Sequence, residues 1–140
     1  YGNERIVDVQ RTEKGFKLIL TARYFFESGS AQIKTTALKD LDQIIASLKE
    51  LGRDLTIEGH TDSIPPRSQM SNWELSTLRA TNVLKYMIRY HNFPPSKLSA
   101  AGYADTKPIA HNGTETGRAL NRRIEIHINY DPEYSTETEY

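Results

Sequence analysis

The sequence contains no cysteine, no excess of charge of either sign and no long hydrophobic run. Without cysteine the chain forms no disulfide, uses no thiolate nucleophile and binds no zinc through sulfur, although this lack does not identify its compartment. Lys plus Arg and Asp plus Glu both total 18, which gives a net charge of zero. Since no basic stretch alternates with aromatic residues, we expect no nucleic-acid partner.

Apolar runs are short throughout the chain. Stretches such as Leu18–Leu20 fall far short of the roughly 20 residues that span a bilayer, and no signal-peptide pattern opens the sequence. Because the chain begins at Tyr1 rather than at methionine, we expect a processed chain or an excised fragment, with any membrane anchor upstream. The 140 residues, of which 37% are hydrophobic, are enough for one domain with its own core.

Hydrophobic periodicity predicts strands and helices in alternation. Segments 5–10 and 15–22 alternate around a glycine-containing turn, which predicts a hairpin. Apolar residues recur at helical spacing from Leu38 to Leu48, and Gly52 follows as a C-cap. Residues 54–60 then alternate as a half-buried strand.

The second half of the chain continues this alternation. Ser71 and Glu74 fit a capping box, so a second helix is expected from Asn72 to about Tyr90, where NFPP ends it. Residues 96–103 predict a short strand, 115–121 a helical turn and 123–130 a last strand. This order predicts an α/β (α+β) sandwich, with helices packed on one face of a mixed sheet.

The predicted elements divide the chain into three parts. Residues 1–15 form an N-terminal strand or linker region, and residues 16–130 form the main domain. Residues 131–140 are polar and acidic without periodicity, which predicts a disordered tail.

Motifs for metal binding and catalysis are missing from the sequence. The candidate ligands do not have the spacing of a zinc motif, so we expect no metal site; they are His60, Asp62, His91, His111 and His127. No G-x-S-x-G motif, paired-carboxylate signature or phosphate-binding glycine loop is present. We therefore expect neither an enzyme nor a bound cofactor.

One polar stripe stands out on the second predicted helix. Asn72, Ser76 and Arg79 are spaced i, i+4 and i+7, which places them on one face of a helix that otherwise supplies core residues. The loop after the strand 54–60 can bring Asp62 within a small ligand's length of Arg79. Two interpretations stay open: a structural salt bridge, or two halves of a receptor for a ligand that carries both charges.

The basic turn before the last strand has a similar ambiguity. Alternation places Arg122 on the same face as Ile124, and Arg123 on the opposite one. The turn is either a solvated basic segment or a place where Arg122 points inward, in which case Arg122 needs an anion.

Five sequence blocks occur in a recognisable order: FFESGSAQI, IEGHTD, SNWELSTLRA, LSAAGYADTKP and NRRIEIHI. Together they resemble the OmpA-like peptidoglycan-binding domain, with its β-α-β-α-β core, over roughly residues 16–130. The SGSA segment, and SNWELS after a lengthened loop, are similar to the periplasmic domains of MotB-type flagellar stator subunits.

The resemblance implies a ligand and a site. Family members bind the stem peptide of peptidoglycan without a covalent bond and hold its diaminopimelate through residues that correspond to Asp62 and Arg79. The motifs complete the expected pocket with Ser28, Thr61, Asn72, Asn121 and Arg122. The loop SIPPRSQM is longer than the short glycine-containing loop of ordinary members, which leaves the pocket rim undefined but not the two anchors.

The resemblance also implies a role in the cell envelope. We expect a periplasmic domain that anchors a membrane protein to the cell wall, most simply a flagellar stator subunit held in the inner membrane by an upstream segment. Such motor proteins work in pairs, so we expect a homodimer. The alternatives are a general outer-membrane or lipoprotein tether without a motor role and, less favoured, an enzyme that acts on peptidoglycan.

Overall fold

The computed structural model describes residues 6–130, which build one five-stranded mixed sheet. The strand order is β1-β2-β5-β3-β4. Among these neighbouring pairs β3–β4 is parallel, and the other three pairs are antiparallel. The strands are β1 (Val7–Thr12), β2 (Gly15–Thr21), β3 (Asp54–His60), β4 (Leu98–Gly102) and β5 (Arg123–Asn129). The boundary expected between residues 15 and 16 falls within the β1–β2 hairpin, and the tail 131–140 lies outside the described residues.

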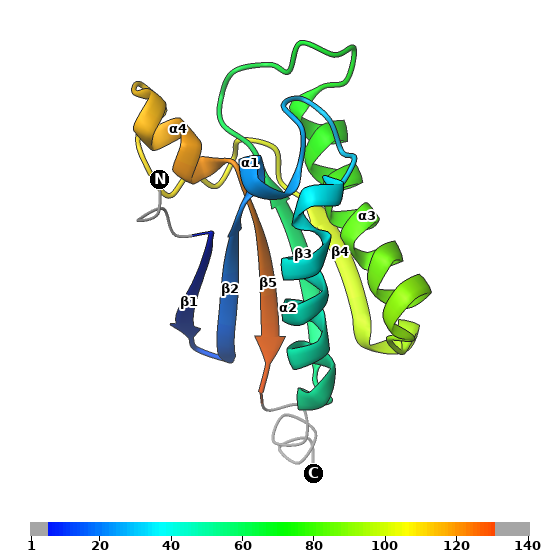
Figure 1. Ribbon diagram of the computed structural model, residues 1–140. Helices are drawn as coiled ribbons and strands as arrows, with labels where there is room; N and C mark the ends of the chain where they lie inside the picture. The colour runs from blue at the N-terminus through cyan, green and yellow to red at the C-terminus, as the bar shows by residue number, and fades with distance from the viewer. Residues whose placement is uncertain (1–5, 131–140) are drawn as a thin grey trace.

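Two long helices lie on the same face of this sheet (Figure 1). The α-helices are α1 (Ala22–Phe25), α2 (Leu38–Leu51), α3 (Asn72–His91) and α4 (Glu115–Asn121), with 3-10 turns at Thr35–Ala37 and Pro95–Lys97. The predicted mixed sheet with helices on one face is confirmed. Sequence periodicity missed α1 and both 3-10 turns, because segments of three or four residues are too short to show a helical repeat.

The helix ends follow from local chemistry. The Ser71 hydroxyl accepts a hydrogen bond from the Glu74 amide, and the Glu74 carboxylate accepts one from the Ser71 amide, so the predicted capping box is present. Gly52 closes α2 at a φ of 65°, a left-handed conformation that glycine adopts without steric cost.

The core lies between the two long helices and the sheet. From α2 it receives Leu41, Ile45 and Leu48, which pack against inward-facing strand residues such as Ile57 and Ile126. A Cβ atom on Gly59 would lie 2.0 Å from the Ser76 carbonyl oxygen, so only glycine lets α3 approach β3 this closely. None of the helices in residues 6–130 is both long and apolar enough to cross a membrane.

The opposite face of the sheet is polar, yet part of it is buried. His60, Arg123 and Glu125 are only 2%, 2% and 3% exposed, although alternation predicts a half-buried strand with His60 on its outer side. The segment after β4 covers His60 and Arg123, since the Lys107 carbonyl accepts a hydrogen bond from Arg123 and Tyr103 stacks on the His60 ring.

The charged residues of this polar face form ion pairs and hydrogen bonds with one another. Hydrogen bonds to the carboxylates of Glu125 and Glu58 raise the pKa of His127 to about 9. Burial works against the charge of Glu58, but hydrogen bonds from His127 and His60 lower its pKa to about 2. Burial also works against the charge of Glu125, the partner of Glu58 on β5, but hydrogen bonds from His127 and Arg123 lower its pKa, so this face carries two ionised carboxylates side by side.

Candidate functional site

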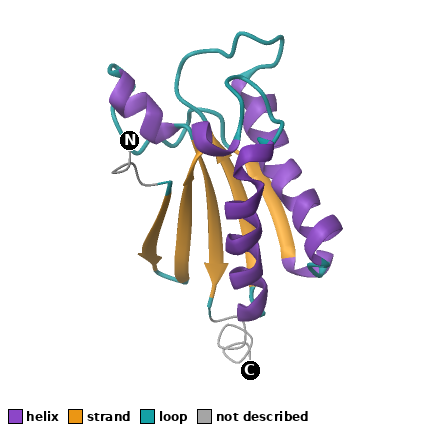
Figure 2. Cartoon of the chain, viewed as in Figure 1, coloured by secondary structure: helices purple, strands orange, loops and turns teal. Residues whose placement is uncertain are grey.

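Two loops meet at the end of the sheet where β3 finishes (Figure 2). Residues 26–34 connect α1 to the start of α2, and residues 61–71 connect β3 to α3. Between them lies a cleft of about 820 Å³. Six of the predicted site residues line it: Ser28, Thr61, Asp62, Asn72, Arg79 and Arg122.

The Asp62 carboxylate is held in a fixed orientation at the base of the cleft. The Thr61 amide donates to the Ala104 carbonyl at 2.9 Å, which ties the chain down immediately before Asp62. One carboxylate oxygen, Oδ1, then accepts the Ile64 amide at 3.0 Å, and the other, Oδ2, accepts Arg122 Nη1 at 2.6 Å. Only 6% of Asp62 is exposed, so a charged group reaching it must come through the cleft.

Arg79 reaches the cleft from α3 but does not pair with Asp62. Its Nε donates to the Ser30 carbonyl at 2.8 Å and its Nη2 to the Glu27 carbonyl at 3.1 Å, while the guanidinium lies 4.9 Å from the centre of the Phe26 ring. A guanidinium has five N–H donors, so these two bonds leave donors on Nη1 and Nη2 for another acceptor.

This arginine is a buried cation, and no carboxylate among residues 6–130 pairs with it. It is 5% exposed, and within residues 6–130 it forms no salt bridge. Burial and the neighbouring Arg122 guanidinium lower the pKa of Arg79 to about 10, with Asp62 acting in the opposite direction. At neutral pH the group is still a cation, and it lies in a cleft that can admit an anion. The simple salt-bridge interpretation of Asp62 and Arg79 is therefore not what the structure contains.

Arg122 links the two acidic groups at this end of the cleft. Its Nη1 contacts Asp62, and its Nη2 contacts Glu115 Oε2 at 2.6 Å. Burial disfavours its charge, but the hydrogen bonds to Glu115 and Asp62 outweigh burial and raise the pKa of Arg122. The prediction that an inward-pointing Arg122 needs an anion is met by Asp62, which lies 60 positions earlier in the sequence.

The two asparagines have structural roles, and only Asn72 lies at the cleft. Its amide donates to the carbonyls of Asp62 and Ile64, both at 3.3 Å, which holds the long loop against the start of α3. Asn121, expected at the pocket, is fully buried and does not line the cleft. Its side chain instead bonds to Ala110 and Asn112, because the loop before α4 has backbone groups that need partners.

Sequence reasoning missed several contributors to the cleft. Glu115 lies seven positions before Arg122, a spacing that fits one face of a helix but carries no motif. The acceptors of Arg79 are backbone carbonyls, which no side-chain pattern reveals.

Other polar residues near the cleft also differ from expectation. Ser76, placed on the polar stripe with Arg79, accepts a hydrogen bond from the Ala104 amide and does not line the cleft. Three further basic side chains line the cleft: Arg23, Lys34 and Arg67.

Comparison with known proteins identifies the family. The profile of the OmpA family matches residues 25–122, a range that contains both loops, α2, β3 and α3. The chain belongs to the OmpA family. The family profile matches the chain up to Arg122, the residue that donates a hydrogen bond to Asp62.

Two curated relatives of this OmpA family chain come from Bacillus subtilis. The uncharacterized protein YtxE is 40% identical over 121 residues, which cover 85% of the chain and 50% of YtxE. Motility protein B is 34% identical over 129 residues, which cover 89% of the chain and 49% of that protein. The chain therefore spans about half the length of these relatives.

Solved structures with the same fold include two from other bacteria. The periplasmic domain of Helicobacter pylori MotB superposes with a TM-score of 0.85 at 26% identity, covering 99% of this chain and 88% of that one. The cell wall anchor of the type VI secretion system from Pseudomonas aeruginosa gives a TM-score of 0.83 at 28% identity, covering 89% and 87%. These likenesses confirm the predicted OmpA-like fold and the similarity to MotB.

Proposed function

We propose that this domain binds peptidoglycan without a covalent bond and grips the diaminopimelate of the stem peptide in the cleft. The observation that carries the proposal is Arg79, a buried cation that has no carboxylate partner in the described chain and keeps donors free. It shares the cleft with the fixed carboxylate of Asp62. The cleft thus presents the Arg79 guanidinium and the Asp62 carboxylate to the same ligand.

Diaminopimelate matches this pair of charges. Its distal carbon carries an ammonium and a carboxylate, so the carboxylate accepts from the free end of Arg79 while the ammonium donates to Asp62. Asp62 already accepts one bond on each oxygen. A carboxylate has about four lone-pair sites, so the ligand's ammonium adds to Asp62 without displacing Arg122.

Binding without catalysis is the activity that this cleft supports. Three acidic residues line the cleft; Asp62 and Glu115 are bound by Arg122, and the third is Glu27. The likeness to a cell wall anchor and to MotB periplasmic domains supports binding over catalysis. Release of muropeptides from purified sacculi by the protein would contradict this assignment.

Cell-wall anchoring of a membrane protein is the biological role we propose. The likeness to motility protein B and to MotB periplasmic domains favours a flagellar stator subunit, acting in the periplasm as a dimer and held in the inner membrane by an upstream segment. The likeness to the type VI secretion cell wall anchor favours a second candidate, an envelope tether without a motor role. A transmembrane helix with an ionisable aspartate in the full-length protein would favour the motor.

Sedimentation with purified sacculi tests the proposed binding. The wild-type chain should pellet with diaminopimelate-containing sacculi, and Asp62→Ala should remain in the supernatant. Asn82→Ala is a control, because Asn82 on α3 donates to the Ala31 carbonyl near the cleft but does not line it. Equal pelleting of wild type and Asp62→Ala would refute the site.

A further inference from the structure

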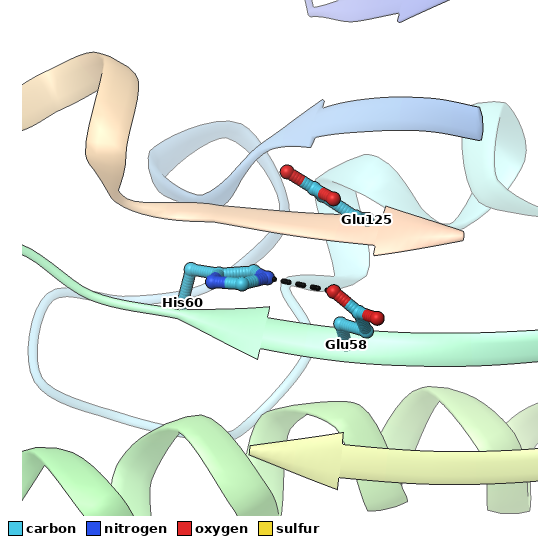
Figure 3. A group of neighbouring side chains, drawn as sticks. All are labelled: Glu58, His60 and Glu125. Atoms are coloured by element: carbon cyan, nitrogen blue, oxygen red, sulfur yellow. Dashed lines mark hydrogen bonds and ion pairs between the residues drawn. The ribbon is translucent and has the colours of Figure 1, made fainter. Parts of the chain in front are cut away.

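Four potential metal ligands gather on the sheet face opposite α2 and α3. Glu58 and His60 come from β3, and Glu125 and His127 come from β5. Glu58 and Glu125 are direct partners in the antiparallel register of these strands, and Figure 3 shows Glu58, His60 and Glu125 converging on one region. Like charges placed directly opposite each other destabilise a sheet, so this pair needs positive charge between or beside it.

The donor atoms are already close to the spacing of a metal shell. Atoms of Glu58, His60 and Glu125 all lie within 4.8 Å of one another. Glu58 Oε1 is 3.0 Å from His60 Nε2 and 3.4 Å from His127 Nε2, and Glu125 Oε1 is 2.8 Å from His127 Nε2. Tetrahedral zinc with bonds of about 2.0–2.1 Å keeps its ligand atoms about 3.3 Å apart, so side-chain rotations can complete the shell.

We propose that Glu58, His60, Glu125 and His127 form a binding site for Zn²⁺ or a similar borderline divalent metal ion. Two imidazoles with two carboxylates suit such a metal, whereas Mg²⁺ and Ca²⁺ prefer oxygen ligands alone. Each imidazole binds the metal through an unprotonated Nε2, so a proton on that atom moves to Nδ1 if the ring is neutral and passes to water if the ring is charged. All four ligands lie on adjacent strands, so the metal cross-links β3 and β5.

Two cations beside the cluster modulate this site. Arg123 Nε donates to Glu125 Oε2 at 2.7 Å, which orients the carboxylate and leaves Oε1 directed towards the other ligands. Lys17 Nζ lies 3.4 Å from Glu125 Oε1 and therefore competes with the metal for that atom. These positive charges lower the metal affinity, and removal of Lys17 should raise it.

The proposed metal site does not depend on the cleft function. The four proposed metal ligands do not line the cleft, and they lie on the polar face of the sheet. No zinc-motif spacing predicts the group, because each strand supplies two ligands at i and i+2 and the strands are paired by the fold. The sequence-based expectation of no metal site rested on spacing along the chain alone.

Calorimetric titration of the chain with ZnCl₂ tests the proposal, with thermal unfolding as a second readout. We expect one zinc per chain and a rise in Tm with ZnCl₂ but not with MgCl₂. Glu58→Gln and His127→Gln should each weaken zinc binding at least about tenfold, since loss of an outer-shell partner alone costs that much. Lys17→Met should strengthen binding, an effect that a purely structural ion network does not predict.

His91→Gln is the matched control for these variants. His91 pairs with Asp42 at 2.8 Å on a different part of the surface and should leave zinc affinity unchanged. His127 is 33% exposed, so His127→Gln stays informative if Glu58→Gln fails to fold. The proposal is overturned if the wild type binds no zinc, if both ligand variants bind as the wild type does, or if Lys17→Met weakens binding.

Discussion

Ligand choice provides the sharpest test of Arg79. In stem peptides with lysine at the third position, the distal ammonium remains but the carboxylate is absent. Asp62 then keeps its partner, while the free donors of Arg79 face no anion. The domain should therefore prefer diaminopimelate stems over lysine stems.

The size of this preference follows from the contacts of Arg79. Its bonds to the Ser30 and Glu27 carbonyls persist with either ligand, so only the interaction at the free end of the guanidinium is lost. Hydrogen bonds to charged groups contribute up to about 3 kcal/mol, and a loss of about 2–3 kcal/mol corresponds to roughly a thirtyfold to 150-fold difference in affinity. Because water can enter the cleft and solvate the guanidinium, we expect the lower end of this range.

Titration calorimetry with the two stem peptides measures the preference directly. Arg79→Ala should weaken binding of the diaminopimelate stem and largely remove the preference, whereas Asp62→Ala should weaken binding of both stems. Arg79→Lys should recover little, because an ammonium lacks the planar fork that matches a carboxylate.

A control variant separates ligand contact from loop support. Arg79 also holds the 27–30 backbone, so its loss can loosen the cleft indirectly. Asn82→Ala removes a similar support, the 2.8 Å bond to the Ala31 carbonyl, without removing a group of the cleft. It should keep both affinity and preference. Equal affinity of the wild type for both stems would refute the role assigned to Arg79.

Three further predictions concern stability. Asn121→Ala should lower the free energy of unfolding by about 3 kcal/mol, measured with urea, because it removes several hydrogen bonds of a fully buried side chain and leaves part-buried backbone groups without these partners. Gly59→Ala should lower Tm by several degrees, since the new Cβ would collide with the Ser76 carbonyl, and overpacking typically costs about 1–3 kcal/mol. Burial and the hydrogen bond to Asp42 raise the pKa of Tyr86 from 10.0 to about 12. Its stabilising contribution should therefore be complete below pH 10 and decline as pH rises towards 12, and Tyr86→Phe should remove this decline in unfolding titrations.

Local chemistry explains why much of the fold is predictable from the sequence. The start of α3 depends on Ser71 and Glu74, three positions apart, and the end of α2 depends on Gly52 alone. Strand alternation likewise needs only neighbouring residues, so the isoleucine face of β5 is predicted correctly. Each of these signals is complete within a few residues of the chain.

Features that depend on distant segments were only partly predictable. The pairing of Asp62 with Arg122 joins positions 60 residues apart, and the sequence indicated only that Arg122 needs an anion. Burial of His60 was missed because the segment that covers it follows β4, more than 40 residues later. Asn121 was assigned to the pocket by family resemblance, whereas its amide bonds to the Ala110 backbone and to the Asn112 side chain in the loop before α4.

The separate partners of Asp62 and Arg79 would keep the buried site that we propose ready for a ligand. If these two groups paired with each other, a ligand would first have to break a buried ion pair, a change that typically costs about 3–5 kcal/mol. In this structure Arg122 neutralises Asp62, and backbone carbonyls and the Phe26 ring hold Arg79. Each group is thereby oriented by contacts that the ligand does not need to displace. Binding energy is then available for affinity rather than for rearrangement, which is the advantage of a preorganised site.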